Sequence, residues 1–255
     1  MDALFDILTV PQLCLAVSIA VFAGLVKGVV GFALPTIIIS GLSTFLSPEL
    51  ALAGLILPTV VTNFMQMLRQ GAWAAWESVK RFRVFLGFGL VTLLIGAQLV
   101  RVLPMDVMLL VIAVPVVSYA MLQLLGIEIT LARHSGKVAA IAGSVAGLMG
   151  GMSGIWGPPT VAYLTALKTD KADHLRVQGV VYGLGAVALL FAHLGSGVLR
   201  AQTLPLSFAM VPPAVLGLWI GGRLLDRIDH VVFRRATLVV LLIAGLNLIR
   251  RAVFV

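Results

Sequence analysis

The sequence predicts an all-α, polytopic membrane protein made of two copies of one helical unit, and three observations support this. Hydrophobic residues make up 60% of the 255 residues and charged residues 11%, whereas soluble domains contain about 45–50% and about 25%. The mean hydropathy is +1.11, and a glycine-rich motif occurs twice. Such a chain cannot cover itself with polar surface, which excludes a soluble enzyme, a disordered tail and a nucleic-acid-binding protein.

The net charge of +8 comes from basic residues in short segments between apolar runs. This distribution is typical of charges that orient a protein in a membrane, so it does not indicate a nucleic-acid partner. The single cysteine, Cys14, excludes an internal disulfide. No basic residue precedes Lys27, so we expect no cleavable signal peptide.

The apolar runs fall into two length classes, because a helix needs about 20 apolar residues to cross the membrane. Six runs are long enough, at 49–68, 82–102, 106–125, 175–198, 204–222 and 232–249. Four are too short, and glycine-rich breaks join them in pairs, 12–27 with 33–46 and 137–150 with 155–167. We expect each pair (12–46 and 137–167) to form a hairpin of half-helices that enters the membrane and returns to the same side.

The positive-inside rule favours this hairpin topology over one continuous, broken span per pair. With hairpins, 13 Lys and Arg residues lie inside and four lie outside, whereas single spans would give nine and eight. The four outside are Arg101, Arg200, Arg250 and Arg251. Two full crossings per pair would give the same count, but each would have only about 13 to 16 residues, short of the length needed. The hairpin topology predicts a bacterial inner-membrane protein with both termini in the periplasm.

The glycine breaks are two copies of one motif, GLVKGVVGFALPT from Gly24 and GLMGGMSGIWGPP from Gly147. A constant offset of 123 aligns Gly24 with Gly147, Gly28 with Gly151, Gly31 with Gly154, and Pro35 with Pro158. IGAQL from Ile95 also matches IGGRL from Ile220, at an offset of 125. The chain is therefore predicted to be a duplication, with halves 1–126 and 134–255. A hairpin plus three spans is an odd number of crossings, which inverts the second copy, and such repeats are typical of transporters.

The duplicated glycine motif, the proline that opens each second half-helix and the chain length together resemble the sulfite exporter TauE/SafE family, also called the toluene sulfonate uptake permease family. The resemblance covers nearly the whole chain. It implies a transporter of small sulfur-containing anions or organic acids, such as sulfite, sulfonates and related carboxylates. It does not identify the substrate.

The geometry of the breaks independently points to an anion. The second half-helices begin at 33–35 and 155–158, deep in the membrane, where a helix start presents unpaired N–H groups and about half a positive charge. Two such starts facing each other would hold a small oxyanion near the midplane, against the backbone of residues 31–36 and 154–160. The alternative is that the glycines serve only close helix packing.

Lys27 strengthens the anion hypothesis, because a cation near the midplane requires compensation. All ten acidic residues lie at span ends or in loops, which leaves an anionic substrate or a ring of carbonyls. In the repeat, Lys27 corresponds to Gly150. A lysine whose ammonium reaches the membrane surface is the alternative.

Polar residues on the long helix after each hairpin are expected to orient the substrate. Thr59, Asn63 and Gln66 form one stripe, and Gln178, Tyr182 and His193 share a face in the second half. Hydrogen bonds between helices are the alternative for each one. His193 is a candidate proton relay. The predicted substrate contacts are Lys27, Gly28, Gly31, Phe32, Pro35, Thr36, Thr59, Asn63, Gln66, Gly151, Ser153, Gly154, Trp156, Pro158, Thr160, Gln178 and Tyr182.

Two other functions use the same residues. Gly151-Met152-Ser153-Gly154 and His193 match the motifs of rhomboid proteases, but His193 would lie about 27 Å along its helix, about 12 Å beyond the centre where Ser153 is expected. An anion channel is a closer alternative to a carrier. The sequence therefore predicts a transporter and no enzyme, with a small anion and the lipid bilayer as partners and with no catalytic residue, cofactor, metal or nucleic acid. Substrate, direction, coupling and oligomeric state are not predicted.

Overall fold

The computed structural model describes residues 8–99, 105–127, 131, 135–153, 157–195 and 197–254. Regular secondary structure in these ranges is entirely helical. The helices are α2 (Val10–Val30), α3 (Leu34–Leu42), α4 (Pro48–Leu68), α5 (Ala72–Arg81), α6 (Arg83–Leu99), α7 (Met105–Leu124), α8 (Gly136–Ser153), α9 (Gly157–Ala166), α10 (Lys171–Gly195), α11 (Leu204–Arg227) and α12 (His230–Phe254).

The chain divides into two compact units. Unit 1 comprises Met1–Arg69 and Tyr182–Ile228, and unit 2 comprises Gln70–Val181 and Asp229–Val255. Unit 1 therefore contains α2, α3, α4, α11 and the later part of α10. Unit 2 contains α5 to α9, the first part of α10, and α12.

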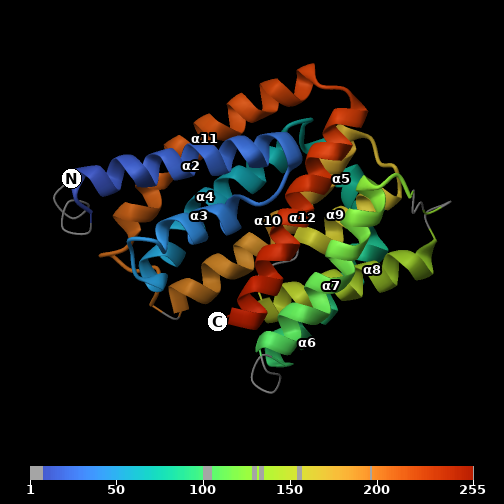
Figure 1. The fold of residues 1–255 in the computed structure, drawn as a ribbon, viewed down its shortest axis with the longest axis horizontal. Coiled ribbons are helices and arrows are strands. Elements are labelled where there is room, and N and C mark those ends of the chain that lie inside the picture. Colours follow the sequence, from blue (N-terminus) through green and yellow to red (C-terminus); the bar gives the residue numbers. More distant parts are fainter. Residues whose placement is uncertain are drawn as a thin grey trace. The chain divides into compact units, whose positions relative to one another are not determined.

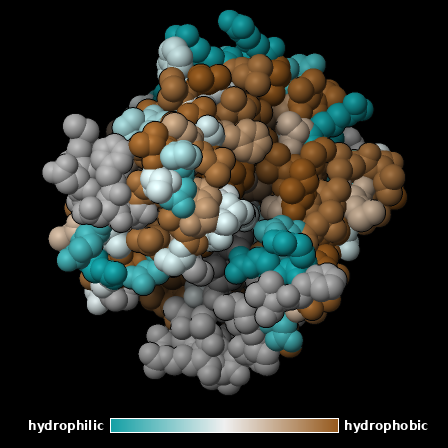
Figure 2. All heavy atoms as spheres, turned by 60° about the vertical axis from the view of Figure 1, so that its left-hand side comes forward, coloured by the Kyte–Doolittle hydropathy of each residue, from teal (hydrophilic) through white to brown (hydrophobic). Residues whose placement is uncertain are grey.

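Five of the described helices are long and apolar enough to cross a membrane, namely α2, α4, α10, α11 and α12. Four of them occupy the predicted spans 49–68, 175–198, 204–222 and 232–249. Helices α6 and α7 occupy the other two, 82–102 and 106–125, although residues 100–104 lie outside the described part. Apolar residues cover much of the face in Figure 2, as expected for a surface in contact with lipid.

The first member of each hairpin is longer than predicted. The prediction ended the first run at 27, but α2 has 21 residues and is itself long enough to span a membrane. The apolar run stops at Lys27 because of its charge, whereas the helix continues to Val30 and ends at Gly31, whose φ of 88° is the left-handed conformation of a helix cap. Helix α8 has 18 residues, where the sequence predicted 137–150.

The second members, α3 and α9, are short, with nine and ten residues. Gly31-Phe32-Ala33 separates α2 from α3, and the positive φ of 73° at Ala33 turns the chain back. Gly41 of α3 then lies beside Ile19 of α2, so the two helices run antiparallel as a hairpin (Figure 1). Residues 154–156, which join α8 to α9, lie outside the described part.

Glycines let α2 approach α11 within unit 1, and α8 approach α6 within unit 2, backbone to backbone. A Cβ added to Gly24 would lie 2.1 Å from the Ala214 carbonyl oxygen. One added to Gly147 would lie 1.9 Å from the Gly89 carbonyl oxygen. These two contacts correspond through the offsets of 123 and 125, and so do those of Gly221 with Leu25 and Gly96 with Leu148. Each helix pair runs parallel.

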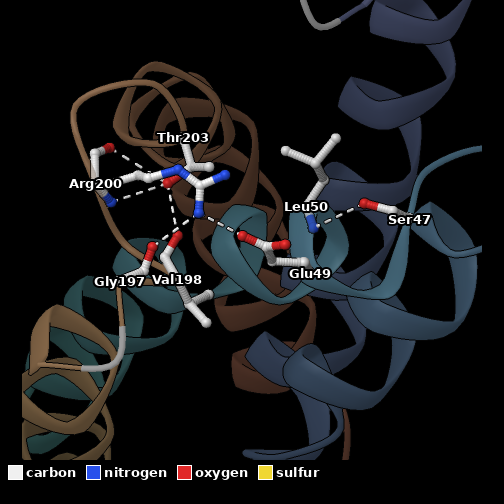
Figure 3. Close-up of polar contacts among 7 residues, drawn as sticks. All are labelled: Ser47, Glu49, Leu50, Gly197, Val198, Arg200 and Thr203. Carbon is white, nitrogen blue, oxygen red and sulfur yellow. Dashed lines mark hydrogen bonds and ion pairs between the residues drawn. The ribbon is translucent and has the colours of Figure 1, made fainter.

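Two ion pairs hold the ends of unit 1 together. At one end, Arg200 from the α10–α11 connection donates to Glu49 in the first turn of α4, and a Thr203 hydroxyl bond to the Val198 carbonyl shapes the connection (Figure 3). At the other end, Arg69 after α4 donates to both carboxylate oxygens of Asp226 on α11, at 2.8 and 2.9 Å. Helices α4 and α11 therefore run parallel.

The ion pair of Glu49 and Arg200 is expected to contribute little to stability, since each side chain is 49% exposed. A Glu49→Gln substitution should lower the free energy of unfolding by less than about 1 kcal/mol. Chemical denaturation in detergent measures this, with Glu77→Gln, an exposed glutamate on α5, as the matched control. A loss of more than about 2 kcal/mol would contradict this interpretation of an exposed pair.

Helix α5 lies between the predicted spans 49–68 and 82–102, where no helix was predicted. Ala75 and Ser78 are buried, whereas Trp73 and Trp76 are 71% and 52% exposed. The Lys80 ammonium lies 5.7 and 5.5 Å from the centres of these two rings. Tryptophan beside lysine on an amphipathic helix is typical of a segment that lies in the membrane interface.

Candidate functional site

The site in unit 1 is built around Lys27, in the last turn of α2. Its side chain is 1% exposed. The ammonium is therefore not at the protein surface, where a lysine that reaches the membrane surface would have it. Lys27 Nζ donates a hydrogen bond to Oδ1 of Asn63 on α4. Lys27 is the charged residue of α2 and lies in its last turn. The cation is therefore at the end of a long apolar helix, next to the glycine break.

Asn63 connects this lysine to a third helix. Its own side chain is 1% exposed, and its amide Nδ2 donates to the Tyr182 carbonyl oxygen of α10 at 3.0 Å. Both ends of the amide are therefore used, which fixes its orientation. In the described part of the chain, Lys27 forms no ion pair with a carboxylate. The described partner of the buried ammonium is therefore a neutral hydrogen-bond acceptor, with no carboxylate beside it.

The start of α3 follows the lysine directly. Gly31 and Phe32 are buried, and Pro35 stands at the start of the helix, where a missing N–H costs nothing. The first intrahelical donor is Ile37 N, which bonds to the Ala33 carbonyl oxygen at 3.0 Å. The N–H groups that precede it belong to the class of helix-start donors that bind anions.

Comparison with known proteins assigns the sequence to a family. A family model described as sulfite exporter TauE/SafE matches residues 16–248. The chain belongs to the TauE/SafE family. No curated protein and no solved structure matches it. Membership confirms the family suggested by the glycine motifs and makes the chain a multi-pass membrane protein of a transporter family. It favours neither the channel nor the rhomboid protease.

The polar stripe on α4 of this TauE/SafE protein is buried along its length. Thr59, Asn63 and Gln66 are 3%, 1% and 4% exposed. Only Asn63 is recorded in contact with Lys27; the Thr59 hydroxyl donates within its helix, to the Leu55 carbonyl oxygen at 2.6 Å. The Thr59 hydroxyl proton is therefore used, and only its oxygen could accept a hydrogen bond from a ligand. The roles of Thr59 and Gln66 in binding stay predictions.

Predicted contacts from the second half belong mainly to unit 2. Thr160 and Gln178 are both 0% exposed there, and Pro158 is also buried. Gly154 and Trp156 lie outside the described residues, and nothing is described for the Ser153 side chain. Their roles, and that of Gly151 on α8, stay predictions.

Tyr182 and His193 lie on the part of α10 that belongs to unit 1. Tyr182 is 4% exposed and contributes its backbone carbonyl to the Lys27–Asn63 network. His193 is half-buried in the last turns of α10, and its role as a proton relay stays a prediction. Sequence analysis missed the carbonyl contact, because every residue has a carbonyl and no sequence signal marks the one that accepts.

Gly28 supports the alternative that glycines of the first break serve close helix packing. A Cβ on Gly28 would lie 2.4 Å from the Leu218 carbonyl oxygen and 2.8 Å from Gly221 Cα, both on α11. Close packing therefore accounts for the missing side chain at Gly28. It does not account for Gly31, whose positive φ ends α2. Thr36 is partly exposed in the first turn of α3. Contact of Gly28, Gly31 or Thr36 with substrate stays a prediction.

Proposed function

We propose that this TauE/SafE protein carries a small sulfur-containing anion, sulfite or an organosulfonate, across the membrane, and that Lys27 binds it. The supporting observation is a buried ammonium whose recorded partner is the neutral amide of Asn63. A cation inside a membrane protein is costly unless it is paired. Within the described residues, one of the three Lys27 N–H groups has a hydrogen-bond partner. The other two could donate to an anion, which would also supply the opposite charge.

The ion pairs of unit 1 suggest the depth of this site. Glu49 and Arg69 are 20 residues apart on α4, about 30 Å along a helix, which equals the thickness of the hydrocarbon core. If these pairs mark the two membrane surfaces, the midplane lies near Thr59. Asn63 is one turn further, about 6 Å toward the Arg69 end. The proposed site is therefore close to the midplane, on the side of Arg69.

The start of α3 is proposed to hold the oxygen atoms of the anion. It follows Lys27 by seven residues, and its first turn contributes unpaired N–H groups and a partial positive charge. Gly31 and Ala33 both have left-handed backbone conformations at this point. Oxygens of a sulfite or sulfonate group could accept from this backbone and from Lys27 together. The second break, around residues 154–160, is proposed to contribute in the same way.

We also propose that the protein is an inverted duplication in the bacterial inner membrane, with both termini in the periplasm. The glycine contacts support the duplication, because both helix pairs use corresponding residues at the same offsets. The parallel direction of α2 with α11 agrees with the proposed topology, in which both helices start outside. Labelling of single cysteines at Thr9 and Gln70 in intact cells tests this topology, since it places the first residue outside and the second inside.

Reconstituted vesicles test the transport function. Purified protein should take up sulfite at a rate that saturates with concentration, and preloaded vesicles should show counterflow, as a carrier requires. Unitary current steps would instead identify a channel. A screen of sulfite, sulfoacetate, sulfolactate, taurine and simple carboxylates should find tightest binding for a sulfur oxyanion. Binding of carboxylates alone would reject the proposed substrate class.

An Asn63→Asp substitution is expected to weaken sulfite binding by at least about tenfold. It preserves the shape of the side chain but puts a carboxylate next to Lys27, which neutralises the ammonium and repels an anion. Equilibrium binding to purified protein measures the effect. The matched control is Asn247→Asp, at the only other asparagine of the chain. Unchanged affinity in Asn63→Asp would show that the anion binds elsewhere.

A further inference from the structure

A second basic feature lies entirely within unit 2, on residues that the proposed transport site does not use. It is a pocket of about 460 Å³ between the end of α7, the α9–α10 connection and the first turns of α12. The lining residues with a polar or basic side chain are Gln123, Thr165, Lys168, Thr169, His174, His230, Arg234, Arg235 and Thr237. No acidic residue is among the described residues that line it.

Two threonine hydroxyls make this pocket more than a basic surface. Thr165 is 8% exposed and Thr237 is 0% exposed, and neither hydroxyl oxygen has a hydrogen-bond partner in the described structure. Both residues line the pocket. A buried hydroxyl without a partner is unfavourable, so these two groups indicate a ligand that forms hydrogen bonds with them.

The charged side chains among the described residues that line the pocket are positive. Lys168, Arg234 and Arg235 contribute three cations. Arg234 is held by its bond to Gln123 Oε1 at 2.5 Å, and Gln123 donates in turn to the Tyr119 hydroxyl.

Three described acids close in sequence to the pocket, Asp170, Asp173 and Asp229, are not among its lining residues. Asp229 accepts from Val232 N at 2.8 Å, as the cap of α12. Asp173 pairs with Arg176 and Arg81 at 2.6 and 3.2 Å. The pocket therefore combines cations with uncharged hydroxyl donors, which is the chemistry that recognises an oxyanion.

We propose that this pocket of unit 2 binds an oxyanion group of the phosphate or sulfonate type, separately from Lys27. The arginine and lysine side chains that line it neutralise the charge, and the hydroxyls of Thr165 and Thr237 donate to the oxygens. A small soluble anion and the headgroup of an anionic lipid carry the same chemistry. The pocket shares no residue with the proposed substrate site, so binding in it is independent of transport.

Equilibrium dialysis of detergent-purified, delipidated protein with radiolabelled sulfate tests the soluble source. Arg235→Gln and Thr237→Val should each weaken sulfate binding by at least about tenfold, as expected for the loss of one charge-assisted hydrogen bond. The control is Arg83→Gln, which removes an exposed arginine of unit 2 outside the pocket and should leave binding unchanged. Repeating the comparison in a Lys27→Met background removes any sulfate bound at the proposed transport site.

Native mass spectrometry of protein extracted from phosphatidylglycerol membranes tests the lipid source. Bound phosphatidylglycerol that is lost in Arg235→Gln and kept in Arg83→Gln would identify a headgroup as the ligand. Thermal unfolding of each variant verifies that it is folded, and Arg235 is exposed, so its replacement is compatible with the fold. If neither sulfate nor lipid binding changes in Arg235→Gln and Thr237→Val, the proposal is overturned.

Discussion

Replacing Lys27 with methionine is expected to reduce sulfite binding and uptake about 10- to 100-fold or more. A charge-assisted hydrogen bond contributes about 1.5–3 kcal/mol, and the substitution also removes the charge that attracts the anion. Methionine has a similar length and removes the cost of burying a charge, which offsets the loss of the hydrogen bond to Asn63. The variant should therefore fold with a stability close to that of wild type. Isothermal titration and vesicle flux measure the two effects on function, and thermal unfolding in detergent measures stability.

Lys80→Met is the matched control for this experiment, because Lys80 lies on α5 in the other unit and outside the proposed site. It removes the same charge from the protein and should change neither binding nor uptake. Wild-type affinity in Lys27→Met would show that the buried ammonium has a structural role only. Loss of binding together with loss of stability would also contradict the proposal, since it would make Lys27 a folding determinant.

Adding one methyl group to Gly147 is expected to destabilise the protein more than any other single change considered. The new Cβ would lie 1.9 Å from the Gly89 carbonyl oxygen and 2.4 Å from Thr92 Oγ1, so α8 and α6 would have to separate. Overpacking of this kind costs about 1–3 kcal/mol, and contact with rigid backbone favours the upper end. A fall of several degrees in the unfolding temperature of Gly147→Ala would measure it.

Gly87→Ala is the matched control, since Gly87 lies on α6 and an added Cβ would have no neighbour within 4 Å. Alanine is the better helix former by about 1 kcal/mol, so this variant should be as stable as wild type or more so. Equal stability of Gly147→Ala and Gly87→Ala would show that the two helices are not in close contact. Gly24→Ala should repeat the effect of Gly147→Ala in unit 1.

The helical class, the family and the short second helices α3 and α9 could be predicted, because apolar run length and glycine-proline breaks are local signals. The extent of α2 could not. Its last turn contains Lys27, whose partner Asn63 is 36 residues away, and a distant hydrogen bond leaves no mark on the local hydropathy pattern. Helix α5 was also missed, since ten residues with two tryptophans and several charges resemble a loop between spans.

The role of each glycine in the repeated motifs could not be predicted from the sequence. Repetition at a constant offset is visible in the sequence, but whether a glycine faces a ligand or a helix depends on its neighbour in space. Gly28 faces α11, about 190 residues further along the chain. The pocket of unit 2 was missed for a related reason. Lys168, Arg234 and Arg235 were treated only as signals of membrane orientation, and Thr165 and Thr237 have no distinctive sequence context.

The backbone contact of α2 with α11 has a consequence for how such a carrier would work. Gly24 and Gly28 on one helix and Gly217 and Gly221 on the other leave no flexible side chains at the contact, so neither helix can slide or rotate past its neighbour without a clash. A carrier must expose its binding lysine first to one side of the bilayer and then to the other. Helices α2 and α11 would therefore have to tilt together as one rigid body.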